Sequence, residues 1–274
     1  MPKILLATDL DRTLLDKGSQ APPGCLEAIR EFTAAGGSFI IATGRPTRGA
    51  LRYPELMALV NAPIISYNGG CISDAATREI LWQKYLPAGL APLIRSALDR
   101  FPMVGALVFR GPEDVTTVTQ PNAYTHEVTW EREHYKTPQL DLECVQEPWN
   151  KIVMAGCRED MAHCTDYIRR NARCEITTIL SEGLFLEIIA PGIHKGDALR
   201  RVAQMLNIDR SHVLAIGDSM NDIEMIQWAQ VGGAVANAEP AVAEAADILV
   251  PSNDAHGIVT FIRETAMPML CSRK

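Results

Sequence analysis

Six short runs of apolar residues stand out along the chain, and each run ends abruptly in polar residues, glycine or proline. Within a run the apolar residues follow one another directly, without the alternation that a half-exposed strand would show. Such continuous runs are typical of strands that are buried on both faces of a parallel sheet. The runs occupy residues 3–8, 38–43, 63–67, 212–217, 232–236 and 247–250.

Helical patterns lie between these runs. Residues 22–37 begin with two prolines, repeat apolar residues at helical spacing and end in two glycines, which are common helix boundaries. A second helical pattern covers residues 196–206. The alternation of strands and helices predicts an α/β core with a doubly wound, Rossmann-like parallel sheet. Ligands of such folds bind beyond the carboxyl ends of the strands, so the residues that follow each run are candidates for a site.

The alternation stops in the middle of the chain, where short strand-like and helical segments are mixed. Such a stretch is long enough to form a separate α+β domain inserted into the first. We therefore expect a core domain made of residues 1–83 and 190–274, and an inserted cap domain of residues 84–189. Two connections to the core would allow the cap to act as a lid over the substrate.

A pair of carboxylates follows the first run. Asp9 and Asp11 are two positions apart at the exit of the strand, so both can point into one site. Paired carboxylates at such a place suit metal binding, or a nucleophile with an acid beside it. A solvated acidic turn would produce the same sequence, so the pair alone leaves both interpretations open.

A second acidic cluster favours the metal. Asp218 and Asp222 follow the fourth run and lead into a helical pattern. A helix cap would explain one of these acids, but not four acids that the predicted sheet brings to one edge. Four carboxylates would repel one another without a cation, and Mg²⁺ prefers a few carboxylates together with a substrate phosphate.

Groups that could bind phosphate lie at the same predicted edge. Thr43 ends the second run and is followed by Gly44 and Arg45, Asn68 follows the third run, and Lys195 directly precedes the second helical pattern. A hydroxyl, loop amides and cationic side chains together can hold a phosphoryl group. Each residue taken singly is also explained by a strand-end turn or a surface position.

Composition and charge narrow the class of protein. The 274 residues carry 26 Lys and Arg against 33 Asp and Glu, a net charge of −7, which opposes nonspecific binding to nucleic acid or an anionic membrane. The seven cysteines are scattered and form no C-x-x-C pair, which argues against a disulfide framework or a structural zinc site. No apolar stretch approaches the roughly 18 residues of a membrane span. We expect a cytoplasmic monomer or homodimer that binds neither nucleic acid nor membrane.

The motifs DLDRTLL, ATGR, HKGDAL and GDSMNDIEM resemble, in this order, the four motifs of the haloacid dehalogenase superfamily of phosphohydrolases. The segments SYNGG, LEIIAPGIHKGDAL and AVANAEPAVAEAADILVPSNDAHGI are similar to its Cof-type subfamily, which inserts a large α/β cap between the second and third motifs. Over the cap the resemblance rests on position and length.

The resemblance implies a role for each matching residue. Asp9 would attack phosphorus and become an aspartyl-phosphate, while Asp11 would protonate the leaving oxygen and then deprotonate the hydrolytic water. Asp11 would need a proton for the first step, which burial or acidic neighbours would favour. Together with Asp9 and Asp11, the catalytic residues would be Thr43 and Lys195. The contacts to substrate or phosphate would be Leu10, Thr43, Gly44, Arg45, Asn68, Lys195 and Asn221, and Mg²⁺ would be held by Asp9, the main-chain carbonyl of Asp11, Asp218 and, directly or as a support, Asp222.

Two positions depart from the family pattern. Arg12 stands where the family usually has glycine, and its side chain either points away from the phosphate or contributes charge to it. Ser219 occupies a position often filled by Asn, which retains hydrogen bonding.

Three functions fit these residues. The first is a Mg²⁺-dependent phosphatase that acts on a small phosphorylated metabolite, such as a sugar or polyol phosphate. The second is a phosphotransferase or phosphomutase, in which a substrate hydroxyl replaces water. The third is a non-catalytic, regulatory phosphate-binding protein, which is disfavoured because all the core motif residues are intact.

Four further residues of the cap segment are candidates for a function. Arg110 and Lys151 either reach an anionic or polyol leaving group or are surface charges. His126 and His134 stand beside acidic residues, where a solvated loop is favoured over a metal site.

Overall fold

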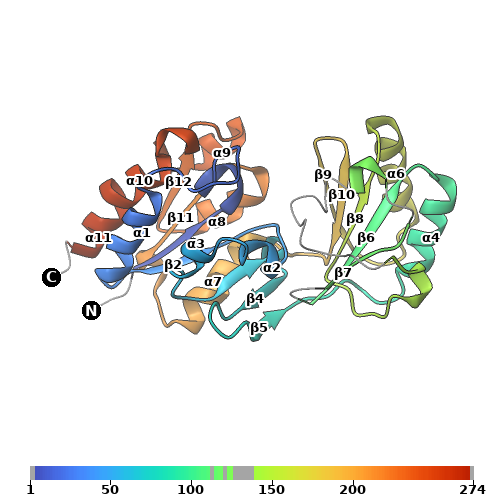
Figure 1. The fold of residues 1–274 in the computed structure, drawn as a ribbon, viewed down its shortest axis with the longest axis horizontal. Helices are drawn as coiled ribbons and strands as arrows, with labels where there is room; N and C mark the ends of the chain where they lie inside the picture. Colours follow the sequence, from blue (N-terminus) through green and yellow to red (C-terminus); the bar gives the residue numbers. More distant parts are fainter. Residues whose placement is uncertain (1–3, 112–113, 120–121, 126–138, 272–274) are drawn as a thin grey trace. The chain divides into compact units, whose positions relative to one another are not determined.

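The computed structural model describes residues 4–111, 114–119, 122–125 and 139–271 (Figure 1). The chain divides into two compact units, one formed by Met1–Gln83 with His194–Lys274 and the other by Lys84–Ile193. We call the first the core unit and the second the cap unit. No helix in the described ranges combines the length and apolar character that crossing a membrane requires.

The core unit is built around a five-stranded parallel sheet with the strand order β13-β12-β11-β1-β2. Each strand overlaps one of the predicted apolar runs, which confirms the doubly wound α/β core. The strands are β1 (Leu5–Thr8), β2 (Ser38–Ile41), β11 (Val213–Gly217), β12 (Val231–Val235) and β13 (Ile248–Val250).

Helices cover both faces of this sheet, which explains why its strands are apolar at successive positions. Successive strand residues point to opposite faces. Leu6 accordingly packs in a cluster with α1 (Cys25–Ala34) and α10 (Gly257–Phe261). Leu5 packs in a second cluster with α7 (Lys195–Met205) and α8 (Ile223–Trp228). The remaining α-helices of the core unit in the described ranges are α2 (Thr47–Ala50), α3 (Pro54–Met57), α9 (Pro240–Ala245) and α11 (Met267–Cys271).

The third apolar run differs from the prediction. β3 (Ile64–Ser66) touches the parallel sheet through one bridge, from Ala42 to Ile65, and otherwise pairs antiparallel with β4 (Cys71–Ser73). β4 in turn pairs with β5 (Ile80–Gln83) to complete a three-stranded sheet. The apolar run indicates that the strand is buried, but it does not specify the partner strand.

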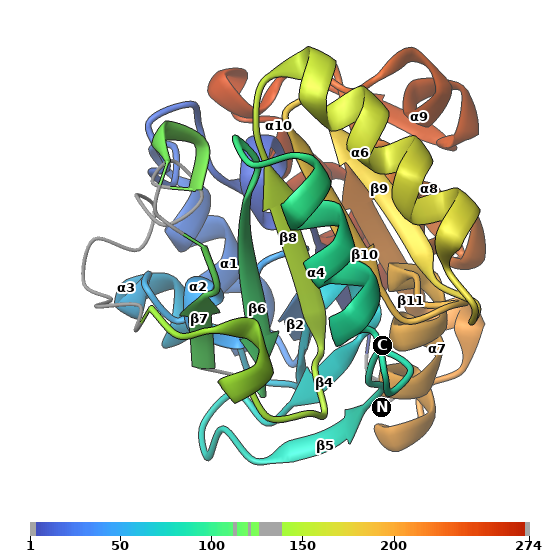
Figure 2. The ribbon, with the colours of Figure 1, turned by 90° about the vertical axis from the view of Figure 1, so that its right-hand side faces the viewer.

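The cap unit contains a five-stranded antiparallel sheet with the order β7-β6-β8-β10-β9, as expected for an inserted α+β unit. Two helices pack on one face of this sheet through Ile94, Met161 and their apolar neighbours (Figure 2). The elements are α4 (Ala91–Arg100), β6 (Gly105–Arg110), β7 (Asp114–Thr117), β8 (Lys151–Ala155), α6 (Arg158–Asn171), β9 (Thr177–Ser181) and β10 (Phe185–Ile189).

Candidate active site

The site lies where three neighbouring strands of the parallel sheet, β11, β1 and β2, end. Thr8 is in register with Ile41 of β2 and with Ile216 of β11, so the residues after these strands meet at one edge. Asp9 continues the ladder by one residue, because its amide donates to the carbonyl of Ile216 at 2.9 Å. The predicted convergence of Asp9, Thr43 and Asp218 at one sheet edge therefore follows from the strand order.

Lys195 is the centre of the charge arrangement. Its Nζ donates to Asp9 Oδ1 and to Asp222 Oδ1, each at 2.6 Å, and its side chain is fully buried. Lys195 is the first residue of α7, and Gly196 lets this helix approach α8 closely. A Cβ at Gly196 would lie 2.6 Å from the carbonyl oxygen of Glu224. Close helix packing thus sets the ammonium between the two carboxylates.

Asp222 is satisfied on both of its carboxylate oxygens. Oδ1 accepts from Lys195, and Oδ2 accepts from the amides of Asp218 and Ser219, at 3.0 Å each. With Ser219 it forms a capping box at the turn after β11. Asp222 therefore links the fourth motif to Lys195 and fixes the backbone that carries Asp218.

Asp218 is buried and is held by hydroxyl groups. Thr13 donates to its Oδ1 at 2.9 Å and Ser219 to its Oδ2 at 3.0 Å. Arg12 Nε lies 3.7 Å from the same Oδ2, on a side chain that is 59% exposed. Arg12 adopts a left-handed backbone conformation (φ 59°), which glycine adopts without strain, and its side chain reaches toward Asp218.

Burial dominates the electrostatics of the site. Burial raises the pKa of Asp9 well above its ordinary value, with Lys195 opposing this shift and the neighbouring Asp222, Asp11 and Asp218 adding to it. Burial and the charge of Asp222 also raise the pKa of Asp218. For Lys195 burial disfavours the charge, but the two carboxylates outweigh it and raise its pKa. The site thus carries more buried negative charge than one ammonium balances.

The three buried carboxylates fit a hard divalent cation. Asp9, Asp218 and Asp222 each offer an oxygen, and these atoms lie within 4.8 Å of one another. Carboxylate oxygens are the protein ligands that Mg²⁺ prefers. A cation would also relieve the repulsion that raises the carboxyl pKa values.

The loops that follow the second and third apolar runs contact each other beside this cluster. The backbone N–H of Asn68 donates to the Thr43 carbonyl at 3.0 Å, and the side-chain Oδ1 of Asn68 accepts from Asn221 Nδ2 at 2.7 Å. A Cβ at Gly44 would lie 2.9 Å from Asn68 Oδ1, so glycine permits this contact. The side chain of Leu10 is buried in the core, so any contact it makes to phosphate involves its main chain.

Arg45 bonds to both carboxylate oxygens of Asp11 through one edge of its guanidinium. Nε donates to Asp11 Oδ2 at 2.8 Å and Nη2 to Oδ1 at 2.5 Å. Arg45 is buried, whereas the Asp11 side chain is 44% exposed. The sequence predicts that Arg45 contacts phosphate, and no sequence pattern indicates that it pairs with Asp11.

Two further residues lie at the site although the sequence analysis does not predict them. Thr13 contacts Asp218, and its place in the DLDRTLL motif, two residues after Asp11, is the sequence feature that could have indicated this contact. The guanidinium of Arg45 lies over the Tyr53 ring, with Arg45 Cζ 5.8 Å from the ring centroid. Tyr53 follows no predicted strand, so no pattern pointed to it.

The candidate residues of the cap segment lie in the cap unit. Lys151 Nζ bonds to Glu187 Oε1 at 2.9 Å and lies 5.2 Å from the centroid of the Phe109 ring. Its side chain is almost fully buried, which rules out a surface charge in this structure. Arg110 Nη1 donates to the Gln146 carbonyl at 3.5 Å. His126 and His134 lie outside the described residues.

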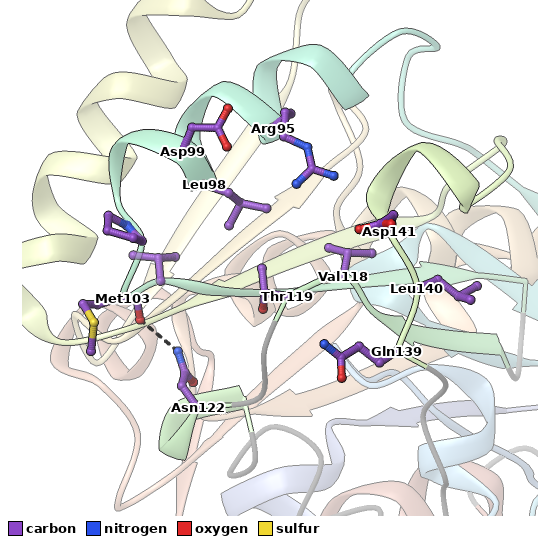
Figure 3. Close-up of a pocket in the computed structure, with 12 residues that line it drawn as sticks. Arg95, Leu98, Asp99, Met103, Val118, Thr119, Asn122, Gln139, Leu140 and Asp141 are labelled. Atoms are coloured by element: carbon purple, nitrogen blue, oxygen red, sulfur yellow. Dashed lines mark hydrogen bonds between the residues drawn. The ribbon is translucent and has the colours of Figure 1, made fainter.

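The cap unit also contains a hollow of about 880 Å³ near α4 (Figure 3). Two of its polar side chains are engaged with neighbours: Asn122 Nδ2 donates to the Met103 carbonyl at 3.0 Å, and Arg95 pairs with Glu143. Among the described residues that line it, no three His, Cys, Asp or Glu side chains lie close enough together to hold a metal ion. The buried carboxylate cluster of the core unit is therefore the better candidate for catalysis.

Comparisons with known proteins identify the family of the chain. A family model described as haloacid dehalogenase-like hydrolase matches residues 6–262. The chain is 29% identical over 270 residues to "Putative phosphatase YxeH" of Bacillus subtilis, covering 96% of this chain and 98% of that protein. It is 28% identical over 265 residues to "5-amino-6-(5-phospho-D-ribitylamino)uracil phosphatase YcsE" of Bacillus subtilis, covering 94% of each.

A solved structure gives the same result for the fold. A haloacid dehalogenase-like hydrolase from Bacteroides thetaiotaomicron superposes with a TM-score of 0.86 at 25% identity, covering 96% of this chain and 99% of that one. The family resemblance and the hydrolase class predicted from the motifs are confirmed. The chain belongs to the haloacid dehalogenase-like hydrolases and is an enzyme of that class.

Proposed function

We propose that the protein is a Mg²⁺-dependent phosphatase that hydrolyses a small-molecule phosphomonoester, with Asp9 as the nucleophile. The observation that carries this proposal is the buried contact of Asp9 with Lys195, beside Asp218 and Asp222. Lys195 holds Oδ1 of Asp9, and within the described ranges no hydrogen bond is formed to Oδ2. One oxygen is thus fixed while the other can attack phosphorus.

The chemistry assigned to Asp9 consists of two displacements at phosphorus. Its Oδ2 forms a bond to phosphorus as the bond to the substrate alcohol breaks, which gives an aspartyl-phosphate. Water then attacks the same phosphorus, inorganic phosphate leaves, and the Asp9 carboxylate is restored. Asp11 gives a proton to the departing alkoxide and takes one from the water. Lys195 stays charged throughout and stabilises the negative charge beside Asp9.

A bound Mg²⁺ would supply positive charge that offsets the charge of the phosphoryl oxygens and of the carboxylates. Asp9, Asp218 and the main-chain carbonyl of Asp11 would hold it. Asp222 would position these ligands rather than bind the ion itself, because its oxygens already accept hydrogen bonds from Lys195 and from the amides of Asp218 and Ser219. Thr43, Gly44 and Asn221 would provide neutral hydrogen-bonding groups to the phosphoryl oxygens.

We place the substrate among sugar and polyol phosphates. The name of the relative YcsE describes a substrate with a phosphorylated ribityl group, which is a polyol phosphate. The core residues contact phosphate and metal, so they do not select the alcohol attached to phosphorus. Selection of the alcohol is therefore assigned to the cap unit.

Release of inorganic phosphate tests this function. The purified protein is incubated with p-nitrophenyl phosphate and with a panel of sugar and polyol phosphates, in Mg²⁺ or in EDTA. We expect phosphate release that requires Mg²⁺ and disappears in the Asp9→Asn variant. Transfer to an added sugar with no phosphate released to water would instead identify a phosphotransferase. Phosphate binding without turnover on any substrate would identify the regulatory alternative.

A further inference from the structure

The ion pair between Arg45 and Asp11 joins the second motif to the first. Two nitrogens of one guanidinium face two oxygens of one carboxylate, at 2.8 and 2.5 Å. A bidentate pair of this kind fixes the plane of the carboxylate as well as its position. The Asp11 side chain is 44% exposed, so packing alone does not fix it. Arg45 supplies the orientation that Asp11 would otherwise lack.

Arg45 is itself held on several sides. Its amide donates to Thr43 Oγ1 at 3.1 Å, and its carbonyl accepts from the amide of Tyr67 at 2.9 Å. Nη1 donates to the Tyr53 hydroxyl at 3.3 Å. A Cβ at Gly49 would lie 3.1 Å from Arg45 Cβ, so the aliphatic stem packs closely on that glycine. The guanidinium that reaches Asp11 is therefore preorganised.

We infer that Arg45 is a positioning residue that acts through Asp11 and does not bind the phosphoryl group. The inference rests on the proposed function, in which Asp11 exchanges a proton with the leaving group and the water. Proton transfer requires a carboxyl oxygen within hydrogen-bond reach of the alcohol oxygen and correctly aimed. All three nitrogens of the guanidinium already donate to side chains, Nε and Nη2 to Asp11 and Nη1 to Tyr53.

The two roles for Arg45 predict different kinetics. Loss of a phosphate ligand weakens binding of substrate and of inorganic phosphate. Loss of a positioning residue slows the proton transfers and leaves phosphate affinity in place. Misplacing a catalytic group by about 1 Å can cost on the order of 100-fold in rate. We therefore expect Arg45→Gln to lower kcat by about 10- to 100-fold, with KM changed by less than about 2-fold.

The test compares Arg45→Gln and Arg45→Lys with Arg52→Gln, a matched substitution of an exposed arginine nearby. Lysine can donate to one carboxylate oxygen but not in fork geometry, so Arg45→Lys should recover part of kcat. Arg52→Gln should match the wild type. A rise in KM and in the inhibition constant of inorganic phosphate, with kcat retained, would overturn the inference.

Two further measurements separate this inference from the proposed function. Calorimetric binding of orthovanadate needs no turnover, and we expect the same affinity in Arg45→Gln as in wild type. A tenfold weaker affinity would make Arg45 an oxyanion ligand, whether or not the enzyme is a phosphatase. In an Asp11→Asn background, Arg45→Gln should cause no additional loss of kcat, because the group it positions is gone. A full additional loss would show that Arg45 acts elsewhere. Thermal melting of each variant confirms that it is folded.

Discussion

Lys195 Nζ lies 2.6 Å from Asp9 Oδ1, although 186 positions separate the two residues along the chain. The same ammonium lies 2.6 Å from Asp222 Oδ1, so one buried cation bridges two buried anions. Removing one partner from such a group leaves an uncompensated charge in a medium that solvates it poorly. Under the proposed function, catalysis and stability therefore depend on the same contact.

We predict that Lys195→Met destabilises the fold by about 3–5 kcal/mol, because Asp9 and Asp222 then face each other without a cation. The two carboxylates raise the pKa of Lys195, so its stabilising contribution is fully present at neutral pH and is lost only as the pH rises through that raised value. Urea unfolding at pH 7 in EDTA measures the loss.

A double variant tests the electrostatic cause of this loss. The substitution Asp222→Asn keeps an oxygen that can accept from the amides of Asp218 and Ser219, but it removes one negative charge. Lys195→Met with Asp222→Asn should therefore recover part of the stability lost in Lys195→Met alone. If the double variant is as unstable as the sum of the two single variants, packing rather than charge explains the effect.

Asp9→Asn is predicted to abolish turnover, with kcat reduced by at least about 1000-fold, because an amide oxygen is a poor nucleophile. Chemical trapping checks the covalent step directly. Borohydride reduces an acyl phosphate to an alcohol, so wild-type protein quenched during turnover should yield homoserine at position 9 in a peptide mass spectrum. Asp11→Asn, which keeps the nucleophile, serves as the control and should still be labelled. Homoserine in Asp9→Asn would contradict the assignment.

The edge of the core sheet could be predicted from the sequence because its cause is local. Runs of apolar residues that are buried on both faces identify parallel strands, and the residues after these runs necessarily meet at the carboxyl edge. Asp9, Thr43 and Asp218 follow from that rule alone. Lys195 begins a helix, and its position was expected from motif order rather than from periodicity.

The contacts beyond that edge depend on side-chain reach and on strand partners, which local patterns do not specify. Arg45 could have pointed at phosphate or at Asp11, and both interpretations fit ATGR. The run at 63–67 indicated burial, yet β3 takes β4 as its main partner. No continuous buried run indicates β9, because its residues are half-buried or exposed and it forms an edge of the cap sheet.

Asp218→Asn is predicted to stabilise the metal-free protein by about 1 kcal/mol at pH 7, a rise in Tm of about 2–4 °C. Burial and Asp222 raise the pKa of Asp218, so its ionised form is disfavoured in the fold. Asn can still accept from Thr13. The same variant should lose the stabilisation by Mg²⁺, since a ligand is removed. Calorimetric scans in EDTA and in Mg²⁺ measure both effects.

The sign of the pH dependence follows from the raised pKa. A carboxyl group whose folded pKa is raised costs the fold nothing at a pH below its ordinary value of about 3.9. Its cost grows as the pH rises from there through the raised value. The advantage of Asp218→Asn in EDTA should therefore be absent near pH 4 and increase toward pH 7. An advantage that is constant across this range would mean that packing rather than charge causes it.

Gly217→Ala is predicted to damage the site through Asp222. A Cβ at Gly217 would lie 2.5 Å from both Cβ and Cγ of Asp222, closer than packed atoms allow. Asp222 must then move, which breaks its contact with Lys195 and with the amides of Asp218 and Ser219. We expect a loss of stability of about 1–3 kcal/mol from overpacking and a fall in kcat of about 100-fold.

Gly18→Ala is the matched control for this substitution. Gly18 is exposed, and the nearest atom to its new Cβ would be Asp16 Oδ1, at 3.2 Å on a side chain that can shift. Its stability should change by less than about 0.5 kcal/mol and its kcat should not change. If Gly217→Ala behaved like this control, Asp222 could be displaced without consequence. The support that Asp222 gives to Lys195 and Asp218 would then have no part in catalysis.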